Sequence, residues 1–327
     1  MDFTLLIAAF GGGLLATMLG GLNSFIFCGL LALAAILGGQ AGAPAIGIFA
    51  FGPVFGPHVA FAGGVAASAF AKTKNHIENG QDIVTPLCTT GDPMVLIVGG
   101  VFGMIGFIIQ YIVAQLLGPV LFTGILGPVV NGAGGASAWT DTVACTVVLS
   151  AIITRLVFGK TGLTGKTPAG ETREYVAKGQ RLGFVLLMGL GLGLLSGGVV
   201  SALGTLGFGG SDTAPAALYL FNMAPTIFFA IAAITLIFIT CGFGFECWHH
   251  VGYPAASTAV IIFTATLSPM AAIIGAAITG MFTMWFGDFV LRTFNSHADT
   301  HIDPPACTIF VMQTINLLIL GGLIFVA

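Results

Sequence analysis

Apolar stretches long enough to cross a lipid bilayer follow one another along almost the whole chain, separated by short breaks rich in Gly and Pro. A transmembrane helix needs about 20 consecutive apolar residues. The pattern therefore predicts long helices near residues 3–22, 24–39, 57–74, 93–117, 138–158, 183–206, 217–241, 270–292 and 306–327. Shorter apolar pieces, typical of re-entrant or broken segments, lie at 43–55, 118–130 and 252–267. We expect an all-α, polytopic integral membrane protein with about ten transmembrane helices.

The same series of motifs occurs twice, in the same order. The first copy reads Gly42-x-Pro44-Ala45, Pro57-x-x-Ala60-x-x-Gly63, Asn75-His76 and Ile83-x-x-Pro86-x-Cys88-Thr89. The second copy reads Gly252-x-Pro254-Ala255, Pro269-x-x-Ala272-x-x-Gly275, Asn295-x-His297 and Ile302-x-x-Pro305-x-Cys307-Thr308. The offset between matched prolines grows slowly along the chain, as small insertions would make it. The chain therefore contains two homologous repeats.

The repeats are expected to span residues 1–158 and 183–327, with a linker at 159–182. An odd number of spans per repeat would invert the second copy in the membrane, whereas an even number would keep it parallel. Residues 1–158 hold five long predicted spans and the ambiguous piece at 118–130. If that piece dips into the membrane and returns, it adds no crossing, the number of spans stays odd, and the second repeat is inverted. We favour this arrangement. Matched Pro- and Gly-broken segments in two repeats are typical of transporters and channels.

Composition narrows the class further. Charged residues make up 6% of the chain and mean hydropathy is +1.05, whereas a soluble domain carries about a quarter charged residues. Most of the Lys and Arg lie in 159–182, so the positive-inside rule predicts that this linker lies in the cytoplasm. We expect the membrane to be a bacterial-type cytoplasmic membrane. No basic patch with interleaved aromatic residues exists, which argues against nucleic-acid binding. Broad Gly- and Phe-rich faces would suit a homo-oligomer.

The most polar stretches outside the linker are the matched segments 75–93 and 295–308. Irregular backbone at membrane depth is tolerated where it is buried in protein or lines a watery cavity. We therefore expect the two segments to meet at the repeat interface and to bind solute, although ordinary aqueous loops would also be polar. Candidate solute-binding residues are His76, Asp82, Thr85, Cys88, Thr89, His297, His301, Asp303, Cys307 and Thr308, together with His58 in an apolar run.

A second interpretation rests on the alternation of imidazole and carboxylate in the second segment. His297, Asp299, His301 and Asp303 would share one face of an extended strand and could hold a divalent metal. His297 and His301 could instead couple proton movement to transport, and Na⁺ coupling is a further alternative. Repeat 1 lacks the alternation, so this interpretation does not use the duplication.

A few ionisable residues lie in or beside the apolar runs, and each has an expected role. Asp141 is expected to begin a helix, and Asp288 to pair with Arg292 four residues later. Glu246, His249 and His250 precede the second Gly-x-Pro-Ala motif and would form either a vestibule or an interfacial cap.

The favoured function is a transporter or channel for a small polar solute, rather than an enzyme, with no resident cofactor expected. The alternatives are a membrane-embedded metal-binding enzyme or metal-ion transporter using the His297–Asp303 alternation, and a non-catalytic membrane subunit of a larger transport complex.

Overall fold

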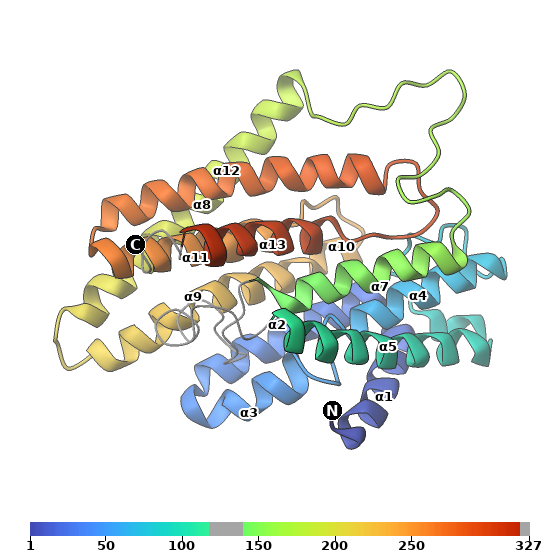
Figure 1. Ribbon diagram of the computed structural model, residues 1–327, viewed down its shortest axis with the longest axis horizontal. Helices are drawn as coiled ribbons and strands as arrows, with labels where there is room; N and C mark the ends of the chain where they lie inside the picture. The colour runs from blue at the N-terminus through green and yellow to red at the C-terminus, as the bar shows by residue number, and fades with distance from the viewer. Residues whose placement is uncertain (118–139, 321–327) are drawn as a thin grey trace.

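The computed structural model describes residues 1–117 and 140–320, which are helical and contain no β-strand (Figure 1). The helices are α1 (Phe3–Leu19), α2 (Gly21–Leu37), α3 (Ala43–Ala45), α4 (Ala60–Thr73), α5 (Pro93–Leu117), α7 (Thr142–Phe158), α8 (Gly179–Phe208), α9 (Ala214–Thr235), α10 (Ile237–Thr240), α11 (His249–Thr266), α12 (Pro269–Phe294) and α13 (Pro304–Thr314). A π-helical turn continues α13 to Leu320. The all-helical prediction is therefore confirmed for the part of the chain that the structure describes.

Four of the described helical segments are long and apolar enough to cross a membrane: Pro93–Leu116, Gly179–Phe208, Ala214–Thr240 and Pro269–Phe294. A fifth crossing is obtained if the bent pair α1 and α2 counts as one span. These lengths and compositions are compatible with a membrane protein, but they do not confirm the expected ten spans. The predicted piece at 118–130, the first residues of the helix at 138–158 and the end of the helix at 306–327 lie outside the described residues.

The break between the first two helices falls at Gly20 rather than near residue 23. The axes of α1 and α2 differ by 115° there. Gly20 has a φ of 93°, and a Cβ at this position would lie 2.4 Å from the carbonyl oxygen of Val84. A residue with a side chain would suffer both a strained backbone and a clash, so only glycine permits this bend.

Helices α1 and α8, which begin the two proposed repeats, each pack closely against a later helix through glycine. Gly13 of α1 lies against Gly99 and Gly103 of α5. Gly189 and Gly193 of α8 lie against the backbone of α12 around Gly280. Because small residues let helix backbones approach, these contacts explain the Gly-rich runs that the sequence places inside both helices.

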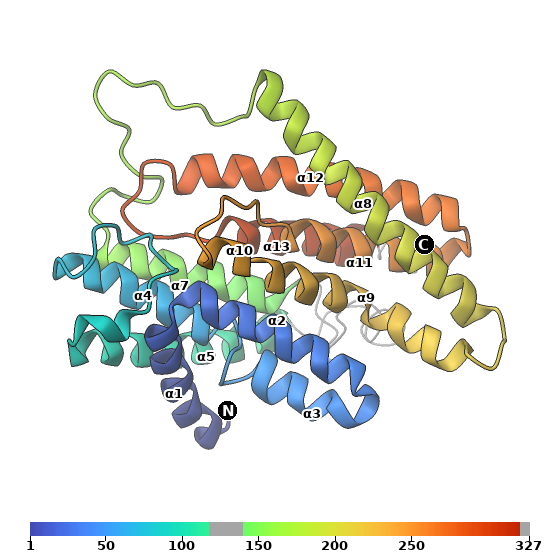
Figure 2. The same cartoon turned by 180° about the vertical axis from the view of Figure 1, so that it is seen from behind.

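Helices of the two halves form two groups that meet along a long boundary (Figures 1 and 2). Helices α1 to α5 and α7 gather on one side, and α8, α9, α11, α12 and α13 gather on the other. The contact between α2 and α9 and the contact between α7 and α13 join the two groups. The cavity described below lies at this boundary.

Candidate functional site

A cavity of about 670 Å³ lies between the two halves of the chain. Its walls come from α2, α4, α5 and α7 to α13, from the residues around Phe51, and from the ends of the polar segments that precede α5 and α13. This volume falls in the range of about 300–1,000 Å³ that is usual for small-molecule sites. The wall is mainly apolar and includes the aromatic residues Phe25, Phe51, Phe61, Phe229, Phe245 and Tyr253.

Asp141 lies in the cavity wall at the start of α7. Its side chain accepts a hydrogen bond from the amide of Ala144 at 2.7 Å, so it caps the helix as the sequence predicted. The hydroxyl of Tyr253 in α11 donates to the same carboxylate at 3.0 Å. Asp141 thus joins the last described helix of the first half to α11 of the second half.

Asp303 occupies the corresponding capping position of α13, and it also lines the cavity. It accepts from the amide of Ala306 at 2.8 Å and contacts Nε2 of His301 at 3.3 Å. Burial alone would raise the pKa of this carboxyl group. The hydrogen bonds to His301 and to the Ala306 amide outweigh that effect and hold the pKa below its usual value.

His249 and His250 begin α11, and both residues line the cavity. Each residue is more than nine-tenths buried. The His249 ring lies 4.9 Å from the ring of Phe25. The Nδ1 atom of each histidine is buried and has no hydrogen-bond partner among the described residues. Buried polar atoms usually form hydrogen bonds, so these two Nδ1 atoms are exceptions in the described structure.

The imidazole of His250 packs against α12 at Gly287, which has no side chain. A Cβ added at Gly287 would lie 2.5 Å from Nε2 of His250 and 2.8 Å from its Cδ2. Glycine at this position therefore lets the imidazole pack directly on the helix backbone.

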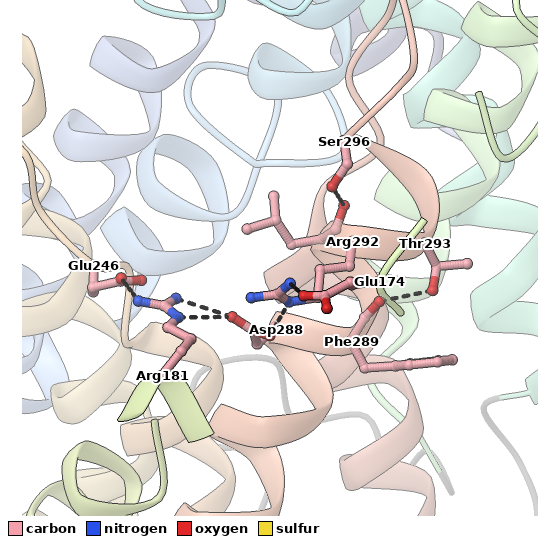
Figure 3. A network of polar contacts seen from close by, with 9 residues as sticks. Glu174, Arg181, Glu246, Asp288, Phe289, Arg292, Thr293 and Ser296 are labelled. Atoms are coloured by element: carbon pink, nitrogen blue, oxygen red, sulfur yellow. Dashed lines mark hydrogen bonds and ion pairs between the residues drawn. The ribbon is translucent and has the colours of Figure 1, made fainter. Parts of the chain in front are cut away.

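An ion-pair network forms one rim of the cavity (Figure 3). Arg181 of α8 donates to Glu246 at 2.5 Å and to Asp288 of α12 at 3.0 and 3.1 Å. Arg292 donates to the other oxygen of Asp288 at 2.5 Å, which confirms the predicted pairing of these two residues, and lies 4.0 Å from Glu174. The network links α8, α12, the start of α11 and the linker.

The two matched polar segments lie against each other. The side-chain amide of Gln81 donates to the carbonyl oxygens of Asn295, at 3.0 Å, and Ala298. A Cβ at Gly80 would lie 2.5 Å from the carbonyl oxygen of Asp299, so the backbones are in close contact. Both segments reach the cavity, the first through Ile83 and Val84 and the second through His301, Asp303, Pro304, Pro305 and Ala306.

Asp82 and Thr85, both predicted to bind solute, instead shape the turn that presents Ile83 and Val84. Oδ1 of Asp82 accepts from the amides of Val84 and Thr85, both at 2.9 Å, and Oδ2 accepts from the Thr85 hydroxyl at 2.6 Å. Burial opposes ionisation, but these hydrogen bonds outweigh it and lower the pKa of Asp82. Neither side chain belongs to the cavity wall as described.

Of the predicted solute-binding residues, only His301 and Asp303 line the cavity. Thr89 and Thr308 donate to carbonyl groups of their own turns, those of Pro86 and Pro304, each at 2.9 Å. His76 pairs with Asp92 at 3.0 Å.

The remaining predicted residues also lie outside the cavity wall. His58 is buried, with its ring stacked 6.5 Å from that of Phe107. Cys88 is exposed and Cys307 is half-buried. The Cys and Thr residues of the repeated Ile-x-x-Pro-x-Cys-Thr motif thus do not make a shared set of cavity contacts. Their fixed spacing instead reflects the turns that follow Pro86 and Pro304 in the two segments.

The alternation His297, Asp299, His301 and Asp303 does not form one face. Asp299 accepts from the Lys160 amide at 2.7 Å and from the Thr161 hydroxyl at 2.8 Å, so it binds the linker. His301 and Asp303 turn to the cavity instead. Among residues 1–117 and 140–320, no group of three or more His, Cys, Asp or Glu side chains is arranged to hold a metal ion.

Arg155 of α7 is a structural residue that the sequence analysis passed over. It is 2% exposed, and no carboxylate lies within ion-pair distance in the described part of the chain. Its guanidinium donates to the carbonyl oxygens of Leu163, Phe294 and Thr300 and to the side chains of Asn295 and Thr300. The sequence signal for this residue is an Arg within an apolar run.

Comparison with protein families identifies the chain as a member of a family of unknown function, DUF7973, which matches residues 1–172 and 191–326. No curated protein and no solved structure matches the chain.

Proposed function

We propose that this protein is a membrane transporter or channel for a small polar solute, and that the cavity between its halves is the solute site. The observation that carries the proposal is the cavity itself, which is of small-molecule size and has ionisable side chains from both halves in an otherwise apolar wall. Such groups are costly inside a membrane protein and commonly mark a substrate or ion pathway.

The proposal includes two inverted repeats, and the packing of α2 against α9 supports it. Phe25 lies 5.3 Å from Phe229, ring to ring, whereas Ile36, near the other end of α2, accepts a hydrogen bond from Tyr219 at 3.0 Å. The two helices are therefore antiparallel. Each is the second helix of its proposed repeat, and equivalent helices that run antiparallel are expected when a twofold axis lies in the membrane plane.

The proposed topology has about ten crossings and re-entrant pieces. The four long spans, the bent pair α1 and α2 and the shorter apolar helices α7 and α13 account for seven of them, and the remaining helical and re-entrant pieces would supply the others. The linker 159–182 would face the cytoplasm of a bacterial-type cell. The linker contacts the second polar segment through Asp299 and through the bond from the Lys166 amide to the His297 carbonyl at 2.8 Å. The second polar segment, which reaches the solute site, would then lie on the cytoplasmic side of the protein.

Flux in proteoliposomes tests the proposal. The purified chain would be reconstituted, and entry of labelled neutral, cationic and anionic solutes compared with entry into protein-free liposomes. At least one solute should enter faster with protein present. Ile83→Trp, which adds bulk to the cavity wall, should reduce that flux, whereas Ile97→Trp, on an exposed face of α5, should not. Equal flux with and without protein for every solute would refute the proposal.

A further inference from the structure

The described residues that line the cavity carry more negative than positive charge. They include the carboxylates of Asp141, Glu246, Asp288 and Asp303, but only one guanidinium, that of Arg181. Arg181 is shared between Glu246 and Asp288 at the rim. Its positive charge is therefore already compensated, and it leaves little attraction for an anionic solute.

Asp141 and Asp303 have no Lys or Arg partner within the described part of the chain. Asp141 receives hydrogen bonds from the Ala144 amide and the Tyr253 hydroxyl. Asp303 contacts the Ala306 amide and His301. Carboxylates withdrawn from water are normally paired with a cation, so these two groups leave room for a positively charged ligand.

Aromatic residues line the same cavity as these carboxylates. Phe25, Phe51, Phe61, Phe229 and Tyr253 all line the cavity, and Phe25 and Phe229 meet edge to face with centroids 5.3 Å apart. The face of an aromatic ring attracts a cation, most strongly where water is excluded, and groups of such rings recognise organic ammonium ions.

The histidine pair supplies a second, independent feature. His249 and His250 are more than nine-tenths buried, line the same cavity, and have Nδ1 atoms without a partner among the described residues. A neutral imidazole carries one nitrogen that accepts a hydrogen bond. An ammonium N–H group satisfies the accepting nitrogen of each ring, which is Nδ1 or Nε2 according to the tautomer.

A compact metal ion fits this wall less well than a larger organic cation. No group of three or more His, Cys, Asp or Glu side chains in residues 1–117 and 140–320 is arranged as a ligand set. The carboxylates and imidazoles instead line a space of about 670 Å³ together with aromatic residues. Metal ions need several ligands at short distance.

We propose, on the premise of the transport function above, that the solute is a small organic ammonium ion. Asp141 and Asp303 supply its counter-charge, the aromatic rings contact its alkyl groups, and His249 and His250 accept from any N–H that it carries.

Four probes test this proposal on the full-length protein in detergent at neutral pH. Tetramethylammonium chloride is compared with tert-butanol, sodium pivalate and potassium chloride at constant ionic strength, by thermal shift and by titration calorimetry. The first three probes share a compact branched alkyl shape but differ in charge. Tetramethylammonium should raise the unfolding temperature, because it binds the folded state, and should bind about tenfold or more tightly than the other three.

Matched capping-residue variants identify the counter-charges. Asp141→Asn and Asp303→Asn remove one charge each but keep a side chain that can cap a helix. Both should weaken tetramethylammonium binding about tenfold. Asp92→Asn is the control, because Asp92 accepts from the Met94 amide at 2.8 Å and lies outside the described cavity wall. It should bind as the wild type does.

Each contrary result has a separate meaning. Equal or tighter binding of tert-butanol or pivalate would overturn the ammonium assignment while leaving transport of a polar solute intact. Equal binding of K⁺ would overturn it in favour of an inorganic cation. If no probe binds, the assignment is wrong, and the flux of neutral solutes into proteoliposomes then decides the proposed function independently.

Discussion

At the scale of single residues, the contact between Gly287 and the imidazole of His250 leaves no room for a side chain at position 287. Gly287→Ala would place a methyl group about 2.5 Å from Nε2 of His250, so the ring must move. We expect a loss of about 1–3 kcal/mol in the free energy of unfolding. Thermal unfolding in detergent measures it.

Gly191→Ala provides the control for that substitution. Gly191 also lies within a long helix, but a Cβ there meets no atom within 4 Å. Alanine should stabilise this helix by about 0.5–1 kcal/mol. If both variants behave alike, the packing of His250 on α12 is not a determinant of stability.

Arg155 should be intolerant of its closest substitute. Lys has three donors on one ammonium group, whereas the guanidinium of Arg155 serves three carbonyl oxygens and two side chains. Arg155→Lys leaves several buried acceptors without a donor, and we expect a loss of about 3 kcal/mol. Lys178→Arg, an exposed exchange in the linker, should change stability by less than about 0.5 kcal/mol. Equal unfolding temperatures for the two variants would contradict this role.

The lowered pKa of Asp82 predicts that the stability of the folded protein decreases in acid. Because this pKa is lowered on folding, the folded state holds the carboxyl proton less tightly than the unfolded state. The stabilisation is present above the unfolded value of about 4 and is lost as pH falls through the lower, folded value. Asp82→Asn should therefore flatten the fall in unfolding temperature between about pH 5 and pH 2. Asp212→Asn, at an exposed carboxylate, should leave it unchanged.

Residue-level prediction from the sequence worked where the partner was close in the chain. The cap by Asp141 and the pair of Asp288 with Arg292 involve neighbours three or four residues apart, so helical periodicity suffices. Contacts between distant parts, such as Arg155 with Thr300 and Tyr253 with Asp141, depend on tertiary packing that no local pattern encodes.

At the scale of elements, the linker is held to the second polar segment. Asp299 accepts from the Lys160 amide and the Thr161 hydroxyl, and Arg173 donates to the Thr293 carbonyl. Asp299→Ala should release the linker and speed tryptic cleavage at Lys160 and Lys166, because proteases cut locally unfolded segments. Limited proteolysis followed by mass spectrometry measures this.

The control for the linker is Glu171→Ala, at an exposed side chain in the same stretch. It should not alter the cleavage rate at the two lysines. Similar rates in wild type and Asp299→Ala would show that the linker does not depend on this contact.

Most helices could be predicted because uniform apolar runs and Pro or Gly breaks mark them. The helix starts at Pro93 and Pro269 follow this rule. The piece at 252–267 was harder, since Pro254 suggested a break, yet α11 runs through it from His249 to Thr266. Its surroundings are tightly packed, and such packing can support a helix that local propensity would interrupt.

At the scale of the whole molecule, the two polar segments were expected to meet, and they do so through Gln81 and Asn295. The repeated motif revealed which segments to compare. It did not reveal which side chains turn inward, because Thr89 and Thr308 satisfy their own turns. The cavity residues His249, His250 and Asp141 belong to helix starts rather than to the repeated motif, so repetition alone could not identify them.

The central claim is that solute crosses through the cavity shared by both halves. Flux into proteoliposomes should therefore be compared for wild type, Ile83→Trp from the first half, the half-buried Ile239→Trp from the second half, and the exposed control Ile97→Trp. The account predicts that each cavity substitution alone reduces flux about tenfold or more, while the control and the unfolding temperatures stay near wild type. Normal flux in either folded cavity variant would contradict it.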